Sequence, residues 1–233
     1  MTDQPNVTLY TYFRSSCSAR LRIALNYKSI PYTSIPINLL KDEQHSAPYN
    51  TTINPSSTVP SLIIRPGAGA INPTNDTVTI TQSLAALEYL EEAFPDKPAL
   101  LPPVSDPAGR AHVRTLASII ACDVQPVTNL RILKRVGALG VDRTAWSKDL
   151  VVEGLAAYEA LASKTAGRFS VGDKLTVADL CLLPAVWGAE RVGLGLEAFP
   201  TVKRVAEALE GEDCVKQGHW RTQEDTPKEL RLT

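Results

Sequence analysis

The sequence predicts an α/β domain followed by an all-α domain. Strand and helix patterns alternate as far as Phe94, and from Asp106 onward nearly all of the chain is helical in pattern. Between them lies a stretch with no apolar period, crowded by prolines at positions 95, 98, 102, 103 and 107. We therefore expect domains at residues 1–94 and 106–233, joined by a linker over residues 95–105.

The first strand and the first helix meet at a short polar turn. Residues 7–12 are rich in β-branched and aromatic residues, as in a strand, and an apolar helical period begins at Leu21. Ser15, Ser16 and Cys17 lie between them. Backbone N–H groups at a helix start have no intrahelical partner and carry the positive end of the helix dipole. This turn therefore favours an anion such as a thiolate.

Three more strands and a helix complete the first domain. Pro36 cannot donate to a strand ladder, so we expect its strand at an edge of the sheet. The segment from Arg65 to Thr77 is rich in small residues and turn formers, which is typical of a flexible connection between two strands. The expected strands span residues 32–39, 59–64 and 78–81, a helix opens at Gln82-Ser83, and residues 41–50 are irregular or form a short helix.

In the second half, local signals mark the helix starts. Asp106 and Pro107 have the form of an N-cap and first helical residue, and Thr176 with Asp179 has the form of a capping box. Residues 180–183 are apolar on all sides, so this helix is expected to be central and buried. The expected helices span residues 110–135 with a bend at Pro126, 144–165, 176 onward and 202–209, and the tail beyond Arg221 is irregular.

Composition and charge exclude several classes of protein. Of the 233 residues, 44% are hydrophobic and 21% charged, and the formal net charge of -1 gives no support for nucleic-acid binding. The first six residues lack the features of a signal peptide, and the most apolar segment, residues 180–186, is too short to span a membrane. Because the four cysteines are widely spaced without a Cys-x-x-Cys, we expect reduced thiols, no metal site and a cytoplasmic protein.

A series of short strings carries a more specific signal. The most specific is SSCSARLRIAL at residues 15–25. The others are PINL at 36–39, NP at 54–55 before VP at 59–60, TQSL at 81–84, EYLEE at 88–92, QPVTNL at 125–130, VGD at 171–173, TVADLCL at 176–182, AER at 189–191 and DTP at 225–227. In this order, and over most of the chain, they resemble the zeta class of glutathione transferases.

The resemblance implies a fold and an activity. The first domain would be thioredoxin-like and bind glutathione, and the second would be the all-helical glutathione transferase domain, with the pocket for the second substrate between them. The implied reaction is the glutathione-dependent cis–trans isomerisation of maleylacetoacetate to fumarylacetoacetate in tyrosine and phenylalanine breakdown. Glutathione would act as a cofactor, the substrate would be a small molecule, and the protein would be a homodimer.

The resemblance also implies roles for individual residues. Ser15, Ser16 and Cys17 would be catalytic, with the Ser15 hydroxyl donating to the thiolate of glutathione. Val59-Pro60 would be a cis-proline turn, and Arg191 would bind a substrate carboxylate, which a guanidinium pairs with in bidentate geometry. The implied glutathione-binding residues are Ser15, Ser16, Cys17, Ser18, Arg20, His45, Val59, Pro60, Gln82, Ser83, Gln125 and Asn129, and the implied substrate-binding residues are Arg191, Gln125 and Asn129.

Other interpretations stay open at this point. Ser15 or Ser16 would equally suit an ordinary helix N-cap, and Arg191 would suit a cation that complements a helix C-terminus. The same site would fit a transferase acting on α-haloacids, or a glutathione-dependent thiol oxidoreductase that uses Cys17. A binding module that has kept the fold without catalysis is a further alternative, which calorimetric titration of glutathione would test.

Overall fold

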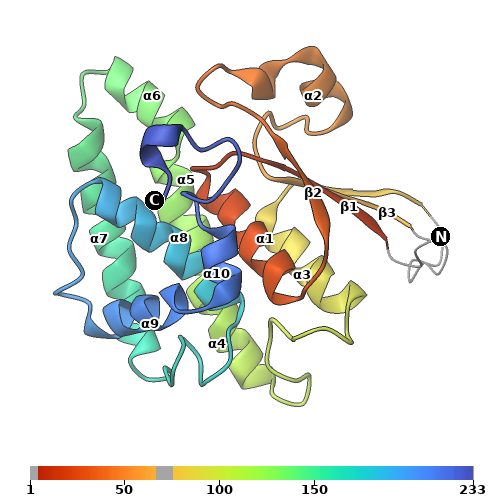
Figure 1. Ribbon diagram of the computed structural model, residues 1–233. Helices are drawn as coiled ribbons and strands as arrows, with labels where there is room; N and C mark the ends of the chain where they lie inside the picture. Colours follow the sequence, from red (N-terminus) through yellow and green to blue (C-terminus); the bar gives the residue numbers. More distant parts are fainter. Residues whose placement is uncertain (1–4, 67–75, 233) are drawn as a thin grey trace. The chain divides into compact units, whose positions relative to one another are not determined.

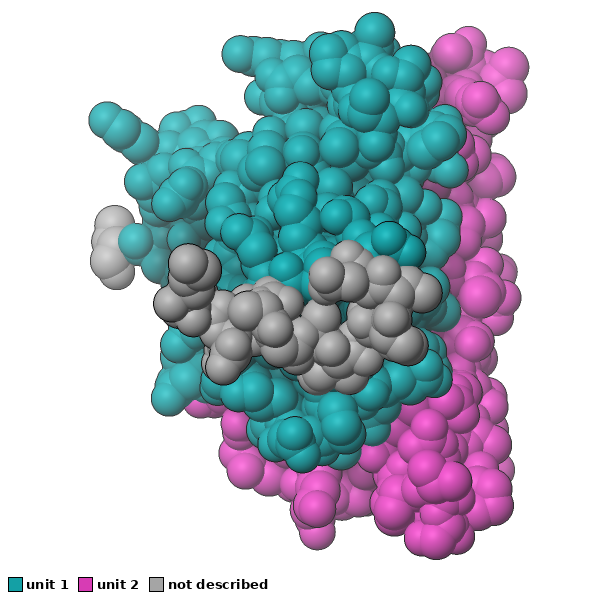
Figure 2. Space-filling model, turned by 90° about the vertical axis from the view of Figure 1, so that its right-hand side faces the viewer, with its two compact units in different colours: residues 1–99, 213–233 teal, residues 100–212 magenta. Residues whose placement is uncertain are grey.

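The computed structural model describes residues 5–66 and 76–232, and its path is drawn in Figure 1. The chain forms two compact units, residues 1–99 with 213–233 and residues 100–212, which are coloured separately in Figure 2. We expect residues 213–233 in the helical domain, whereas the structure places this segment with the first unit. Hydrogen bonds join this segment to that unit: Arg22 donates to the Gly218 carbonyl, and the Asp225 carboxylate accepts from the N–H of Phe13, in the turn after the first strand.

The first unit is built on a four-stranded sheet in the order β2-β1-β3-β4. Strand β1 is parallel to β2 and antiparallel to β3, and β3 is antiparallel to β4. The edge position expected for the strand with Pro36 is confirmed. The strands span Asn6–Thr11 (β1), Tyr32–Pro36 (β2), Ser61–Arg65 (β3) and Val78–Ile80 (β4). Of the connection expected at 65–77, residues 67–75 lie outside the described residues.

Helices cover both faces of this sheet because successive side chains of a strand point to opposite sides. Tyr10 of β1 points towards α2, where its ring centroid lies 5.6 Å from that of Tyr49. Helices α1 and α3 lie side by side on the other face, and α10 packs beside α1 (Figure 1). The helices of this unit are α1 (Ser16–Tyr27), the 3₁₀ turn η1 (Glu43–His45), α2 (Ala47–Thr52), α3 (Ser83–Ala93), α10 (Asp213–Gly218) and the 3₁₀ turn η3 (Lys228–Leu230).

The second unit is helical. Its elements are α4 (Pro107–Ser118), the π-helix η2 (Ile119–Val124), α5 (Gln125–Thr128), α6 (Leu130–Ala138), α7 (Arg143–Ala162), α8 (Val177–Arg191) and α9 (Pro200–Glu210). The single bent helix expected over residues 110–135 is therefore divided into four segments. Pro126 has no N–H to continue the α-helical ladder, the Gln125 N–H bonds the Ile120 carbonyl five residues back, and Asn129 is extended.

Helix α8 has the buried, capped form that its sequence predicts. The Asp179 carboxylate accepts hydrogen bonds from the Thr176 N–H at 2.8 Å and the Thr176 hydroxyl at 2.9 Å, which completes the capping box. It also accepts from the Ser170 N–H at 2.8 Å. Burial raises the pKa of Asp179, although these hydrogen bonds oppose the shift. The Asp179 carboxylate therefore hydrogen-bonds within the protein and stabilises the start of α8.

Candidate active site

Ser15 caps the helix that the polar turn begins. It has extended backbone angles, φ −72° and ψ 118°, and its Oγ accepts a hydrogen bond from the Ser18 N–H at 3.1 Å. A hydroxyl that accepts in this way still has its own proton to donate. The two interpretations of Ser15 are therefore compatible, because the cap holds the oxygen while the O–H stays available to an anion at the helix start.

The neighbours of Ser15 differ in how far solvent reaches them. Ser16 and Cys17, the first two residues of α1, are half-buried, and their N–H groups belong to the helix turn that lacks intrahelical acceptors. Ser18 is completely buried. Among the described residues its Oγ has no hydrogen-bond partner. Ser15, Ser16 and Cys17 are thus the members of this string that are accessible to a ligand.

A second helix start lies within the same unit. Gln82 is the N-cap of α3, and in the described part of the chain its side chain makes no capping hydrogen bond. The first-turn N–H groups of α3 therefore suit a carboxylate. The Ser83 hydroxyl accepts a hydrogen bond from Nη1 of Arg20 at 3.1 Å, and both residues are buried. Arg20 therefore acts on this helix start through Ser83.

The loop residues singled out by the sequence are also defined. The Val59–Pro60 peptide bond is cis, as the resemblance implies. His45 is exposed in the 3₁₀ turn η1, whereas its neighbour Gln44 is buried. Within the described residues, Oε1 of Gln44 has no hydrogen-bond partner, so it is an acceptor that a ligand N–H would satisfy. Sequence reasoning missed Gln44, since burial of one residue in a polar loop leaves no pattern.

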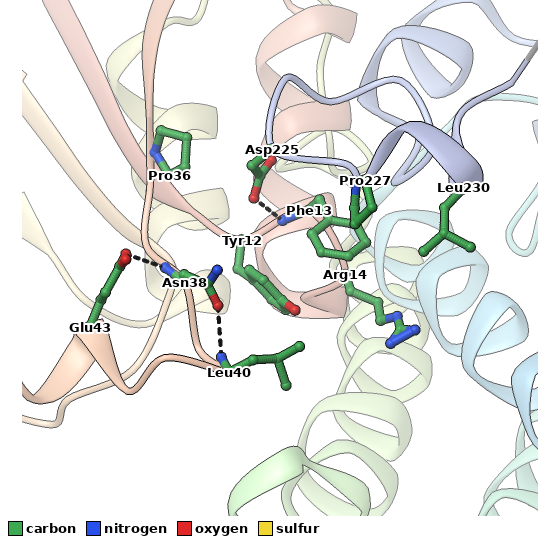
Figure 3. A pocket seen from close by; sticks show the side chains of 10 residues that line it. All are labelled: Tyr12, Phe13, Arg14, Pro36, Asn38, Leu40, Glu43, Asp225, Pro227 and Leu230. Atoms are coloured by element: carbon green, nitrogen blue, oxygen red, sulfur yellow. Dashed lines mark hydrogen bonds between the residues drawn. The ribbon is translucent and has the colours of Figure 1, made fainter.

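A pocket of about 440 Å³ lies beside the turn that precedes Ser15 (Figure 3). The rings of Tyr12 and Phe13 lie at its centre. Arg14, directly before Ser15, is exposed, and its Cζ lies 5.7 Å from the centroid of the Phe13 ring. Burial raises the pKa of Tyr12, Asp225 raises it further and Arg14 opposes the shift, so the phenol stays protonated at neutral pH. The pocket is lined by Tyr12, Phe13, Arg14, Pro36, Asn38, Leu40, Glu43, Asp225, Pro227 and Leu230.

The second unit contains the other three candidates. Gln125 starts the short helix α5, and Asn129 is the N-cap of α6, where its Oδ1 accepts from the Ile132 N–H at 3.0 Å. Its Nδ2 donates one N–H to the Pro126 carbonyl at 2.8 Å, and the amide nitrogen carries a second N–H that suits a ligand acceptor. Arg191 is exposed at the last residue of α8, where its charge also complements the helix dipole.

Comparison with known proteins identifies the family. The model for the N-terminal domain of glutathione S-transferases matches residues 14–93, and the model for the C-terminal domain matches residues 147–213. A maleylacetoacetate isomerase of Emericella nidulans is 68% identical over 97% of this chain and 96% of its own length. The chain belongs to the zeta class of the glutathione S-transferase family. The resemblance stated from the sequence is confirmed.

Further relatives of this glutathione S-transferase support the same assignment. A maleylacetoacetate isomerase of Aspergillus fumigatus is 66% identical over 100% of this chain and 98% of its own length. The crystal structure of a maleylacetoacetate isomerase from Anaeromyxobacter dehalogenans, with bound glutathione in its active site, has a TM-score of 0.84 at 37% identity and covers 97% of this chain and 100% of that chain. The structure of a bacterial maleylpyruvate isomerase of the zeta class has a TM-score of 0.83 at 35% identity. It covers 94% of this chain and 100% of that chain.

The thioredoxin-like and helical architecture expected from the sequence is also confirmed for this glutathione S-transferase. Over the described residues, no helix has both the length and the apolar character that a membrane crossing needs.

Proposed function

We propose that this protein is a glutathione-dependent isomerase that converts maleylacetoacetate to fumarylacetoacetate. The observation that carries the proposal is its 68% and 66% identity, over nearly the whole chain, to two fungal proteins named maleylacetoacetate isomerase. The helix start at Ser15 adds a physical reason, because it presents a hydroxyl and backbone N–H groups to an anion.

The residues of the first unit fit glutathione as the cofactor. Glutathione carries a thiol and two carboxylates, so it needs donors for a sulfur anion and for carboxylates. The start of α1 supplies the first kind through Ser15, Ser16 and Cys17, and the start of α3 supplies the second kind at Gln82 and Ser83. We assign the amide and carboxylate contacts of the remaining peptide to Val59, Pro60, His45 and the adjacent Gln44, whose Oε1 is an unsatisfied acceptor within the described residues.

The chemistry of isomerisation follows from these roles. When bound, glutathione supplies a thiolate that adds to the activated double bond, leaves a single bond free to rotate, and is eliminated unchanged. Ser15 donates its hydroxyl proton as a hydrogen bond towards the sulfur, and the N–H groups of Ser16 and Cys17 add the positive end of the helix dipole. These groups favour the thiolate over the thiol, whose ordinary pKa near 8.5 leaves only a small anionic fraction at neutral pH.

The substrate is a diketo acid whose carboxylates and developing enolate charge need cationic or donor groups. We assign this role to Arg191, with Gln125 and Asn129 as further polar contacts, and the helical domain thereby supplies the residues for the second substrate. The exposed guanidinium of Arg191 supports the assignment, since it pairs with a carboxylate in bidentate geometry. Such groups stabilise charge where it develops during the reaction.

Cellular context extends the proposal. We propose that the protein works in the cytoplasm as a homodimer and that its reaction belongs to tyrosine and phenylalanine breakdown. The wide spacing of the four cysteines, with no Cys-x-x-Cys, supports a reducing compartment. Light scattering on the purified protein would test the dimer, which predicts twice the chain mass of 25.2 kDa.

The test is an isomerisation assay with maleylacetoacetate in three conditions: with glutathione, without it, and with S-methylglutathione, whose sulfur cannot form a thiolate. The proposal predicts turnover in the first condition alone. Turnover of α-haloacids without isomerisation would support the transferase alternative instead. Disulfide reduction that Cys17→Ala abolishes, again without isomerisation, would support the thiol oxidoreductase.

A further inference from the structure

The turn that carries the Ser15 donor is joined to the far end of the chain by one buried arginine. Arg22, on α1, is 0% exposed. Its Nη1 donates to the Thr11 hydroxyl at 2.9 Å and to the Tyr12 carbonyl at 3.3 Å, and its Nη2 donates to the Phe13 carbonyl at 3.0 Å. Its Nε donates to the Gly218 carbonyl at 3.0 Å. One guanidinium thus fixes the last residue of β1, the turn that follows it and the C-terminal segment.

Asp225 makes the reciprocal contact from the C-terminal segment. Its Oδ2 accepts a hydrogen bond from the Phe13 N–H at 2.8 Å, two residues before Ser15. Phe13 is therefore held on both sides of its backbone, at its carbonyl by Arg22 and at its N–H by Asp225. Figure 3 shows the Asp225 contact at the edge of the pocket.

Hydrogen bonds within the C-terminal segment fix the position of Asp225. The Thr226 hydroxyl donates to the Trp220 carbonyl at 2.6 Å. Arg231 donates to the carbonyls of Thr226 at 3.0 Å and Glu224 at 2.7 Å. The Trp220 ring also contacts Phe13, with ring centroids 6.4 Å apart. These bonds close a loop that presents the Asp225 carboxylate to the turn.

Charge strengthens both contacts. Burial lowers the pKa of Arg22 to about 10, and the neighbouring Asp225 and Tyr32 oppose that shift, so the guanidinium stays charged at neutral pH. Hydrogen bonds in which one partner is ionised are about twice as strong as neutral ones. The Phe13 backbone is therefore held by two charge-assisted hydrogen bonds, one at its carbonyl and one at its N–H.

We propose that Asp225 and Arg22 are positioning residues for glutathione activation: they hold the Phe13 peptide so that the Ser15 hydroxyl is aimed at the sulfur. This inference rests on the proposed function. It adds that the C-terminal segment, more than 200 positions from the turn, sets the strength of the thiolate site. Neither residue touches the cofactor in this role, and each acts through the backbone of the turn.

The test uses the pKa of the glutathione thiol in the binary complex, followed by thiolate absorbance against pH. Asp225→Ala removes both the acceptor and a negative charge, whereas Asp225→Asn removes the charge and keeps an oxygen that accepts the Phe13 N–H. Loss of a negative charge near a thiolate lowers the thiol pKa, and loss of the Ser15 donor raises it. The two effects have opposite signs, so the pair of variants separates them.

We expect Asp225→Ala to raise the bound thiol pKa by about one unit, which lowers the thiolate fraction about tenfold at a pH below both values. Asp225→Asn is expected at or below the wild-type pKa. In the ligand-free protein, hydrogen exchange of a peptide over residues 12–20 is expected to be faster in Asp225→Ala than in wild type. Glu229→Ala, a change at an exposed carboxylate of the same segment, is expected to match wild type in both measurements.

Some results of these measurements would contradict the roles of Asp225 and Arg22. A thiol pKa in Asp225→Ala that is no higher than in Asp225→Asn would overturn the inference, even if Asp225→Ala melts at a lower temperature. If wild-type protein binds no glutathione, or leaves its thiol pKa at the free value, the proposed function itself fails. Arg22→Lys provides a second check, since a lysine keeps the charge and loses the fork that spans the turn. Its thiol pKa is expected to rise, and a wild-type value in folded Arg22→Lys would contradict the role of Arg22.

Discussion

Nη1 of Arg20 donates a hydrogen bond to the hydroxyl of Ser83 at 3.1 Å, which joins α1 to the first residue of α3. Helix α1 begins at the residue after Ser15, and the start of α3 has N–H groups that suit a carboxylate. The two helix starts proposed for glutathione are therefore tied together by one buried contact.

This contact predicts the effect of Ser83→Ala. The substitution removes the hydroxyl proposed for the glutathione carboxylate together with the acceptor for Arg20, and a typical net hydrogen bond contributes about 1 kcal/mol. We expect the dissociation constant for glutathione, measured by calorimetry, to rise about five- to tenfold. Ser147→Ala is the matched control, because Ser147 is likewise a buried helical serine but lies in the other unit. Equal affinity in wild type and Ser83→Ala would contradict the role of Ser83.

A second prediction concerns pH and the C-terminal segment. Burial lowers the pKa of His219 to about 4, with the positive charges of Arg221 and Arg22 adding to the shift. The unfolded chain therefore takes up this proton near pH 6.5, while the folded protein resists it until about pH 4. Because the ring is only partly buried, we expect the loss of unfolding free energy across this range to be about 1–2 kcal/mol.

Denaturant titrations between pH 7 and pH 4 would measure this effect. His219→Gln is expected to flatten the pH dependence by that amount, while the control His112→Gln, at an exposed histidine, leaves it intact. Identical pH profiles for wild type and His219→Gln would show that His219 is not the group responsible.

Much of the fold could be predicted because its signals are local. The edge position of β2 follows from Pro36, and the capping box follows from the spacing of Thr176 and Asp179. The position of the C-terminal segment has no such signal, since Arg22 and Gly218 are separated by 196 positions and only the folded chain brings them together. The sequence predicts a bend at Pro126, but it does not predict the π-helix before it, whose last residue, Val124, packs against Gly154 of α7.

The candidate site shows the same contrast. The accessible turn at Ser15, Ser16 and Cys17 could be predicted from residue types at a helix start. The burial of Arg20 and Gln44 could not, because nothing in the local sequence distinguishes a buried polar side chain from an exposed one. Sequence alone does not show that Arg22 contacts the protein itself, because an arginine in such a motif is equally suited to a ligand. In the structure, its guanidinium donates to the backbone carbonyl of Phe13.

Close packing of α10 on α1 gives a third prediction. A Cβ added at Gly218 would lie 2.7 Å from Cγ1 and 3.0 Å from the backbone nitrogen of Ile23. Since the backbone cannot move aside as a side chain does, we expect Gly218→Ala to lower the unfolding free energy by about 1–3 kcal/mol, measured by denaturant titration. At Gly188, also helical, an added Cβ meets Arg191 Nη2 at 3.5 Å, an ordinary contact. Gly188→Ala should be neutral or stabilising by up to about 1 kcal/mol, and equal losses at both sites would refute the packing argument.

The central claim is that Ser15 activates glutathione for isomerisation, and the turnover of maleylacetoacetate by Ser15→Ala at saturating glutathione tests it most directly. Ser15→Thr is the matched variant, because threonine keeps both the cap and the hydroxyl. Removal of one donor from a developing or stabilised anion costs about 100- to 1,000-fold in kcat. We predict a loss of this size in Ser15→Ala and retention of most activity in Ser15→Thr. Undiminished glutathione-dependent turnover by folded Ser15→Ala would contradict the account.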